Sequence, residues 1–359
     1  MLESELKKRN LPNLFNVDGQ QISTVKEWEQ KGRAYWKNVI QKEGYGFFPH
    51  IVKPKISTSI NNVDFAGKAK WETVLFTFSV NGKEHTVPTN LIYPKNKENI
   101  PFFIYINFRS DIPDRYMPVE EIIDNGFGIF SVCHNDITTD NGDFTNGLAG
   151  LFQEGERKDG DCGKITYWSY MASRMMDYLQ TLPYVDKHCI GVSGHSRLGK
   201  TALLTAAFDE RFAFSCPNNS GCSGVAISRG CCERGEKVAD ICKTFPYWFT
   251  PAYHKYANDV DKLPFDQHCL VALVAPRLVY VGGALEDVWA DNDSQFLSCV
   301  EASKVWRLYG KDGMICPDRL PVCGDVFTEG EVGFHLRAGT HYQSREDWNV
   351  YMSALKKKL

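Results

Sequence analysis

The most chemically suggestive stretch of the sequence is residues 194–201, which read GHSRLGKT. A short apolar run with glycines precedes this stretch, and a segment rich in Ala and Leu follows it. A strand, a sharp glycine turn and a helix in that order can hold a serine exposed at the tip of the turn as a nucleophile. The same residues also satisfy G-x-x-x-x-G-K-[ST], a loop whose backbone cradles phosphates. Ser196 is therefore a candidate nucleophile, and Lys200 with Thr201 is a candidate phosphate site.

Two later strand ends supply the other groups that a serine nucleophile needs. Glu286 and Asp287 follow an apolar run at 277–282, and His341 lies in a loop after the run at 332–336. A histidine can take the serine proton as a general base, and a carboxylate can orient that histidine. The order serine, acid, histidine is that of the α/β-hydrolases. The spacing does not decide which of the two carboxylates, Glu286 or Asp287, is the acid.

The elements that must position these residues favour the hydrolase turn over the phosphate loop. Alternating residues on both sides of Asn81-Gly82 predict a β-hairpin. Two strand–helix units follow before residue 194, whereas a phosphate loop usually follows an early strand. The sequence therefore predicts an α/β-hydrolase fold, in which helices flank a mostly parallel central sheet on both faces as a three-layer sandwich.

The order of the predicted elements also divides the chain into two parts. We expect an N-terminal extension at residues 1–60, with one helix at 24–41, and a catalytic domain at residues 61–359. A loop rich in Asp, Asn and Gly is expected at 134–163. Strands are predicted at 71–80, 85–93, 101–107, 128–133, 212–216, 277–282 and 332–336, and helices at 119–125, 165–182, 293–306 and 345–356.

The amino-acid composition indicates which kinds of binding partner and which cellular compartment to expect. The chain has 359 residues and a formal net charge of −3, so charge gives no reason to expect nucleic acid or an anionic membrane as a partner. The twelve cysteines include no C-x-x-C pair, which argues against a zinc site and favours free thiols in a reducing compartment. Residues 1–9 lack a hydrophobic stretch. We therefore expect a monomeric cytoplasmic protein as the sequence stands, and a secreted or periplasmic one if a signal precedes it.

With these motifs taken together, the sequence resembles the glucuronoyl esterases, carbohydrate esterase family 15, and in particular their bacterial branch. The resemblance extends over roughly residues 70–355. It begins with the motif G-[C/H]-S-R-x-G-K, which residues 194–200 match, and the ordered motifs are highly specific together. The other matching motifs are NNSGCSG at 218–224, FPYWF at 245–249, LPFDQH at 263–268, APR at 275–277, EDVWAD at 286–291 and HLRAGTH at 335–341.

The resemblance implies a serine esterase that uses no metal and no cofactor. Such an enzyme cleaves esters between (4-O-methyl-)glucuronate of glucuronoxylan and lignin-type or simple alcohols. Ser196 would be the nucleophile, His341 the base and Arg197 a donor to the oxyanion. The residues that would contact the sugar are Lys200, Trp289 and Glu236.

This sequence departs from the fungal pattern at the acid. Fungal members carry a glutamate shortly after the serine turn, where this sequence has Asn219. An amide can orient an imidazole but cannot balance its positive charge, so we expect the acid at Glu286 or Asp287 and prefer Asp287. Two other functions stay open, a serine carboxylesterase or acetylesterase acting on another acyl group and a P-loop nucleotide binder. An inactive hydrolase fold that binds carbohydrate is a further alternative.

Overall fold

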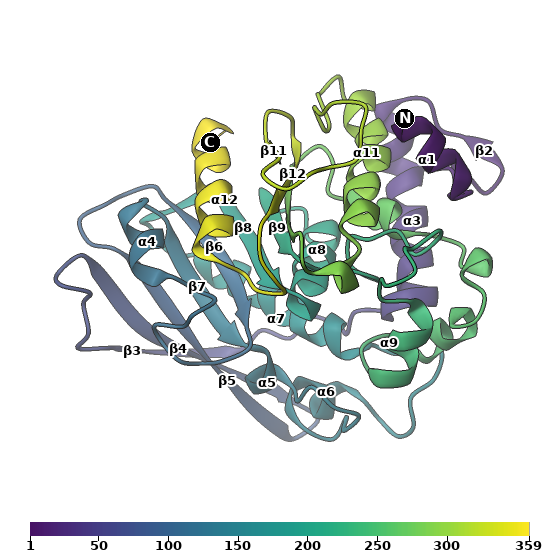
Figure 1. Ribbon diagram of the computed structural model, residues 1–359. Helices are drawn as coiled ribbons and strands as arrows, with labels where there is room; N and C mark the ends of the chain where they lie inside the picture. Colours follow the sequence, from purple (N-terminus) through teal and green to yellow (C-terminus); the bar gives the residue numbers. More distant parts are fainter. Residues whose placement is uncertain (359) are drawn as a thin grey trace.

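The computed structural model describes residues 1–358 and is built around one ten-stranded sheet (Figure 1). The strand order is β11-β12-β10-β9-β8-β6-β7-β5-β4-β3. From β12 to β7 neighbouring strands run parallel, whereas β3, β4, β5 and β11 join antiparallel. The strands of this sheet are β3 (Lys55–Ile60), β4 (Ala69–Val80), β5 (Lys83–Pro94), β6 (Ile100–Asn107), β7 (Gly128–Cys133), β8 (Val185–His195), β9 (Phe214–Asn218), β10 (Leu278–Ala284), β11 (Val326–Phe327) and β12 (Val332–Arg337).

Helices cover both faces of the sheet. Strands β7, β9, β10 and β12 are buried along their whole length, as expected of apolar runs in a parallel sheet that is covered on both sides. Among these helices are α4 (Val119–Asp124), α7 (Lys164–Leu179), α8 (Arg197–Phe208), α9 (Val238–Thr244), α10 (Gln267–Ala272), α11 (Asn292–Leu308) and α12 (Arg345–Lys358).

Two hydrophobic cores lie on the two faces. On one face Trp348 of α12 packs edge to face on Phe103 of β6, with ring centroids 5.2 Å apart. On the other face Leu203 of α8 shares a core with Ile104 and Val192, whose strands lie side by side. The predicted three-layer arrangement is confirmed. Within residues 1–358 no helix combines the length and hydropathy that a membrane span requires.

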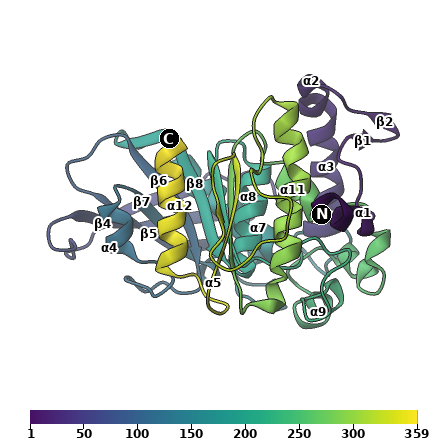
Figure 2. The ribbon, with the colours of Figure 1, turned by 45° about the horizontal axis from the view of Figure 1, so that its top comes forward.

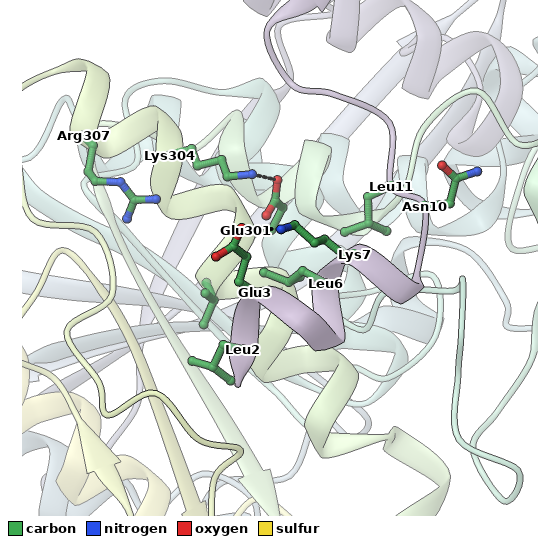
Figure 3. Close-up of a pocket in the computed structure, with 10 residues that line it drawn as sticks. Leu2, Glu3, Leu6, Lys7, Asn10, Leu11, Glu301, Lys304 and Arg307 are labelled. Carbon is green, nitrogen blue, oxygen red and sulfur yellow. Dashed lines mark hydrogen bonds and ion pairs between the residues drawn. The ribbon is translucent and has the colours of Figure 1, made fainter.

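The N-terminal residues pack onto the same body (Figure 2). The predicted helix is present as one helical segment, formed by α2 (Val25–Glu27), η1 (Trp28–Gly32), α3 (Arg33–Ile40) and η2 (Gln41–Tyr45). The N-terminal extension also contains a second helix, α1 (Leu2–Lys8), which the sequence did not predict. Helix α1 lies against α11, and a pocket of about 450 Å³ lies between the two helices (Figure 3). Trp28 and Trp36 are buried in the core of the catalytic part, so the extension and the sheet share one core. A small hairpin, β1 (Asn16–Val17) with β2 (Gln20–Gln21), precedes them.

The predicted loop at 134–163 contains two short helices, α5 (His134–Ile137) and α6 (Gly147–Phe152). Three further helical turns lie beyond the serine turn, η3 (Pro251–Tyr256), η4 (Val260–Lys262) and η5 (Val288–Ala290). The last of these follows β10 directly, where the candidate acids lie.

The turn between β8 and α8 holds Ser196 in an unusual backbone conformation, with φ 58° and ψ −125°. A residue with a side chain adopts a positive φ only at a cost in energy. The Ser196 N–H donates to the Asn218 carbonyl of the next strand at 2.9 Å. Gly194 packs against the first turn of α8, and this close approach leaves the serine at the tip of the turn.

His195, the last residue of β8, is buried in neutral form. Its Nδ1 lies 2.7 Å from Asn218 Oδ1, and its ring stacks on Tyr116. Burial, together with the nearby His341, lowers the pKa of His195 from its usual 6.5 to about 3. The native state therefore takes up no proton at this position in mildly acidic solution.

The close contact at Gly194 can be tested. A Cβ at this position would lie 2.4 Å from the Leu198 carbonyl oxygen, which belongs to the backbone of α8 and cannot move alone. We expect Gly194→Ala to lower the free energy of unfolding by at least about 2 kcal/mol in urea titrations. Gly142→Ala is the control, because no heavy atom lies within 4 Å of its Cβ position. Equal stability of the two variants would contradict this packing.

The buried His195 predicts how stability depends on pH. Below pH 6.5 the unfolded chain protonates this histidine, whereas the folded chain does not until about pH 3. The unfolded state thus binds more protons in that window, and stability falls as the pH is lowered through it. Between pH 7 and pH 5 the wild type should lose about 2 kcal/mol more than His195→Gln, measured by urea unfolding. The same loss in both proteins would show that His195 is not buried in neutral form.

Candidate active site

Three strand ends bring the candidate catalytic residues to one edge of the sheet. Ser196 follows β8, Asp287 follows β10 and His341 follows β12, and these strands run parallel in the order β12-β10-β9-β8. In an open parallel sheet, ligands bind outside the carboxyl ends of the strands. Ser196 and His341 accordingly line one pocket of about 160 Å³.

The histidine pairs with the second of the two adjacent carboxylates. His341 Nδ1 lies 2.6 Å from Asp287 Oδ2, and Asp287 is 4% exposed. Glu286 is exposed to solvent. A neutral imidazole that donates its Nδ1 proton to a carboxylate keeps Nε2 free to accept another proton. The geometry thus brings Asp287, and not Glu286, to the histidine.

A buried ion pair fixes the loop that carries His341. The Asp347 carboxylate is buried and accepts from His335 Nε2 at 2.7 Å and from Arg337 Nε at 2.9 Å. Arg337 also donates to the Ala338 carbonyl at 2.7 Å, at the start of the loop. Truncating one member of such a buried pair would leave the other charge without compensation. The position of His341 therefore depends on interactions well below the pocket.

Arg197 contributes a backbone and a side chain to the site. It is the first residue of α8, where the N–H has no acceptor inside the helix and the helix dipole favours negative charge. Its guanidinium forms an ion pair with Asp140 and lies 4.7 Å from the Trp248 ring centroid. The pocket that Ser196 lines thus has an unpaired donor and a fixed cation beside the serine.

The three predicted sugar contacts line the same pocket. Lys200 is buried, and its Nζ lies 2.6 Å from the Ser220 and Cys222 carbonyls and 3.2 Å from Glu236 Oε2. Trp289 is 51% exposed at the rim. A phosphate at Lys200 would meet the negative charge of Glu236, so this environment disfavours the nucleotide alternative.

Two residues near the site are placed in a way that the sequence did not indicate. Asn219, which stands where fungal members carry their glutamate, lines the pocket but makes no hydrogen bond to His341. Among residues 1–358, neither polar atom of its side chain has a hydrogen-bond partner. Asp140 lies in the predicted loop at 134–163 and contacts Arg197 from a distance of 57 residues along the chain. Only the folded structure could reveal that contact, because no motif links the two positions.

Comparison with known proteins gives the family. The family model described as "Glucuronyl esterase, fungi" matches residues 76–310, more than half of the chain. A carbohydrate esterase from an unknown prokaryotic organism is 31% identical over 399 residues, and the match covers 98% of this chain and 90% of that protein. A 4-O-methyl-glucuronoyl methylesterase of Schizophyllum commune is 28% identical, with 83% of this chain and 73% of that protein covered.

Solved structures agree with the sequence matches. A glucuronoyl esterase from Solibacter usitatus is 31% identical and superposes with a TM-score of 0.89 over 97% of each chain. A promiscuous family 15 esterase from a marine bacterial metagenome is 28% identical and superposes with a TM-score of 0.89 over 98% of each chain. The predicted α/β-hydrolase fold is confirmed by these likenesses. The chain belongs to the glucuronoyl esterases of carbohydrate esterase family 15, which are carboxylic ester hydrolases.

Proposed function

We propose that this chain hydrolyses esters of glucuronic or 4-O-methyl-glucuronic acid through an acyl-enzyme on Ser196. The observation that carries the proposal is the pairing of His341 with the buried Asp287 beside the pocket that Ser196 lines. Relatives named as 4-O-methyl-glucuronoyl methylesterases support the choice of acyl group. Lignin-type or simple alcohols in glucuronoxylan are the leaving groups that we propose.

The proposed reaction has two halves. His341 Nε2 takes the Ser196 hydroxyl proton while the oxygen attacks the ester carbonyl, and Asp287 balances the charge of the imidazolium. The protonated His341 then gives this proton to the departing alcohol oxygen. In the second half His341 deprotonates a water molecule that hydrolyses the acyl-enzyme, and glucuronate leaves. The first proton leaves with the alcohol, and His341 passes the proton taken from water to the departing Ser196 oxygen, so Ser196 and His341 end the cycle unchanged.

The developing negative charge on the carbonyl oxygen needs donors that are already in place. The Arg197 N–H at the start of α8 is one such donor, because it has no acceptor within its helix. A donor aimed at the oxyanion in a site with little water contributes on the order of 3 kcal/mol to the barrier reduction. We propose this N–H, with the Arg197 side chain nearby, as the oxyanion site.

The sugar is proposed to lie against Lys200, Glu236 and Trp289. A sugar hydroxyl can donate to the Glu236 carboxylate, whose charge the Lys200 ammonium balances, so this buried ion pair suits neutral hydroxyl groups. All three protons of Lys200 Nζ already have an acceptor within 3.2 Å, which fixes the Glu236 carboxylate before substrate arrives. The exposed Trp289 indole offers an apolar face to the C–H face of the sugar ring.

Substitutions in the catalytic group test the mechanism. Ser196→Ala and His341→Ala should each lower kcat for a benzyl glucuronate ester by about a thousandfold or more. Asp287→Asn should lower it at least about a hundredfold, since the imidazolium loses its counter-charge. Glu286→Gln is the matched control and should keep near wild-type activity, because Glu286 is exposed. Wild-type turnover by Ser196→Ala, or equal losses from the two acid substitutions, would refute the assignment.

Two substitutions separate a uronate esterase from a general esterase. Glu236→Gln and Trp289→Ala should lower kcat/KM for the benzyl glucuronate ester by about tenfold or more, because sugar contacts are lost. Both should leave kcat/KM for an aryl acetate within about twofold, since this substrate has no sugar to bind. Parallel losses on both esters would favour the acetylesterase alternative instead.

A further inference from the structure

We propose that Asp140 and His134 are positioning residues for Arg197 in the ester hydrolysis, holding its guanidinium in the one orientation that leaves a donor free for the substrate. The inference rests on the proposed serine mechanism and adds two residues from the loop at 134–163 to it. Neither residue belongs to a motif that the sequence singled out. They act through Arg197 and do not touch the ester.

Asp140 is held on every side. One carboxylate oxygen forms an ion pair with Arg197 Nη1, and the other accepts from Trp248 Nε1 at 2.7 Å. Its backbone carbonyl accepts from the Tyr247 hydroxyl at 3.0 Å, and its N–H donates to Asn135 Oδ1 at 2.9 Å. The side chain is 10% exposed. A carboxylate fixed in this way has one direction in which it can hold a guanidinium.

The charge of Asp140 is secure. Burial alone would raise its pKa, but the hydrogen bonds from His134 and Trp248 and the positive charge of Arg197 outweigh burial and lower the pKa to about 2. Asp140 is therefore an anion throughout the pH range in which an esterase works. A charge-assisted contact is roughly twice as strong as a neutral hydrogen bond, which suits a positioning role.

His134 lies beside the same carboxylate oxygen of Asp140 that Arg197 contacts. It is 3% exposed, with Nδ1 3.1 Å from the Asn107 carbonyl oxygen and Nε2 3.5 Å from Asp140 Oδ2. Phe108 and Trp168 pack edge to face with its ring, at centroid distances of 5.5 and 5.1 Å. Asp140 Oδ2 thus contacts both the His134 imidazole and the Arg197 guanidinium, so His134 helps to fix the carboxylate that orients Arg197.

The Arg197 side chain is enclosed by the pocket wall. Its guanidinium carbon lies 4.7 Å from the Trp248 ring centroid and 5.1 Å from that of Phe245, and these rings stack 3.8 Å apart with an interplanar angle of 3°. Trp248 also donates to Asp140, so Asp140, Arg197 and Trp248 form a closed triangle of contacts. Within residues 1–358 the buried Arg197 Nε has no acceptor. Nη1 is committed to Asp140 and Nε is buried, so the Nη2 N–H groups are the donors that this arrangement leaves for a substrate oxygen.

The test is a double-mutant cycle on the full-length chain with a benzyl glucuronate ester. Asp140→Asn keeps the size of the side chain and the acceptor for Trp248 but removes the charge. It should lower kcat by about 100-fold, the effect of a misplaced catalytic group, with KM within about threefold of wild type. In an Arg197→Met background the same substitution should lower kcat by less than about threefold, because the group that it positions is absent. His134→Gln should lower kcat by a smaller factor than Asp140→Asn does. In the Arg197→Met background, His134→Gln should leave kcat unchanged.

Three outcomes would overturn the proposal. The first is an equal factor for Asp140→Asn in both backgrounds, which would mean that Asp140 does not act through Arg197. The second is a rise in KM at unchanged kcat. The third is that Trp248→Phe, which removes the indole donor but keeps a ring, reproduces the loss, because Asp140 would then act through the pocket wall. If Asp140→Asn does not fold, Asp140→Glu keeps the charge, shifts the carboxylate by one methylene and takes its place in the cycle. If Ser196→Ala is inactive but the double-mutant cycle shows no coupling between Asp140 and Arg197, the serine mechanism stands and only this inference is refuted.

Discussion

The backbone of Ser196 is the constraint on which the rest of the site depends. A positive φ between a buried strand and a helix forces the chain to turn within one residue, and Gly194 permits the helix to pack close enough for that turn. The turn does two things at once. It lifts the serine out of the sheet, and it starts α8 with an N–H that has no acceptor of its own. A nucleophile and an oxyanion donor therefore come from adjacent residues, and their separation is fixed by backbone geometry.

The other functional groups are held in place by carboxylates that the protein has largely taken out of water. Asp287 holds His341, Asp347 holds the loop around it, Asp140 holds Arg197, and Glu236 is paired with Lys200. Buried ion pairs add little net stability, but leaving one partner alone is costly. Each pair therefore acts mainly as a constraint on position. The site is built from a rigid turn and four carboxylates, which fix the cations and imidazoles around them.

Much of the fold could be predicted from the sequence, because its signals are local. The hairpin around Asn81-Gly82 and the apolar parallel strands appear where alternation and apolar runs indicated them. The helix α1 and the short helices in 134–163 were missed, because segments of four to seven residues have too few turns to show a period.

The site could be predicted in its residue types but not in its pairings. Glu286 and Asp287 are neighbours, so no spacing separates them. Their difference arises because the loop after β10 bonds to the strand end and loop of β12, through Leu285 N–H to the Arg337 carbonyl and Glu286 N–H to the Gly339 carbonyl. That contact joins segments about 50 residues apart and turns Asp287 inward. The contact of Asp140 with Arg197 is likewise long-range, and a single sequence carries no signal for it.

The most direct measurement of the central claim is to identify the residue that carries the acyl group during turnover. A phenyl ester of glucuronic acid has a good leaving group, which favours accumulation of the acyl-enzyme over its hydrolysis. Rapid acid quenching followed by peptide mass spectrometry should find the glucuronoyl group on the peptide that contains Ser196. This acyl-enzyme should form at least as fast as phenol is released in the steady state. The same peptide from Asp287→Asn should acylate much more slowly. A glucuronoyl group on any other residue, or single-turnover phenol release that Ser196→Ala does not slow, would contradict the account.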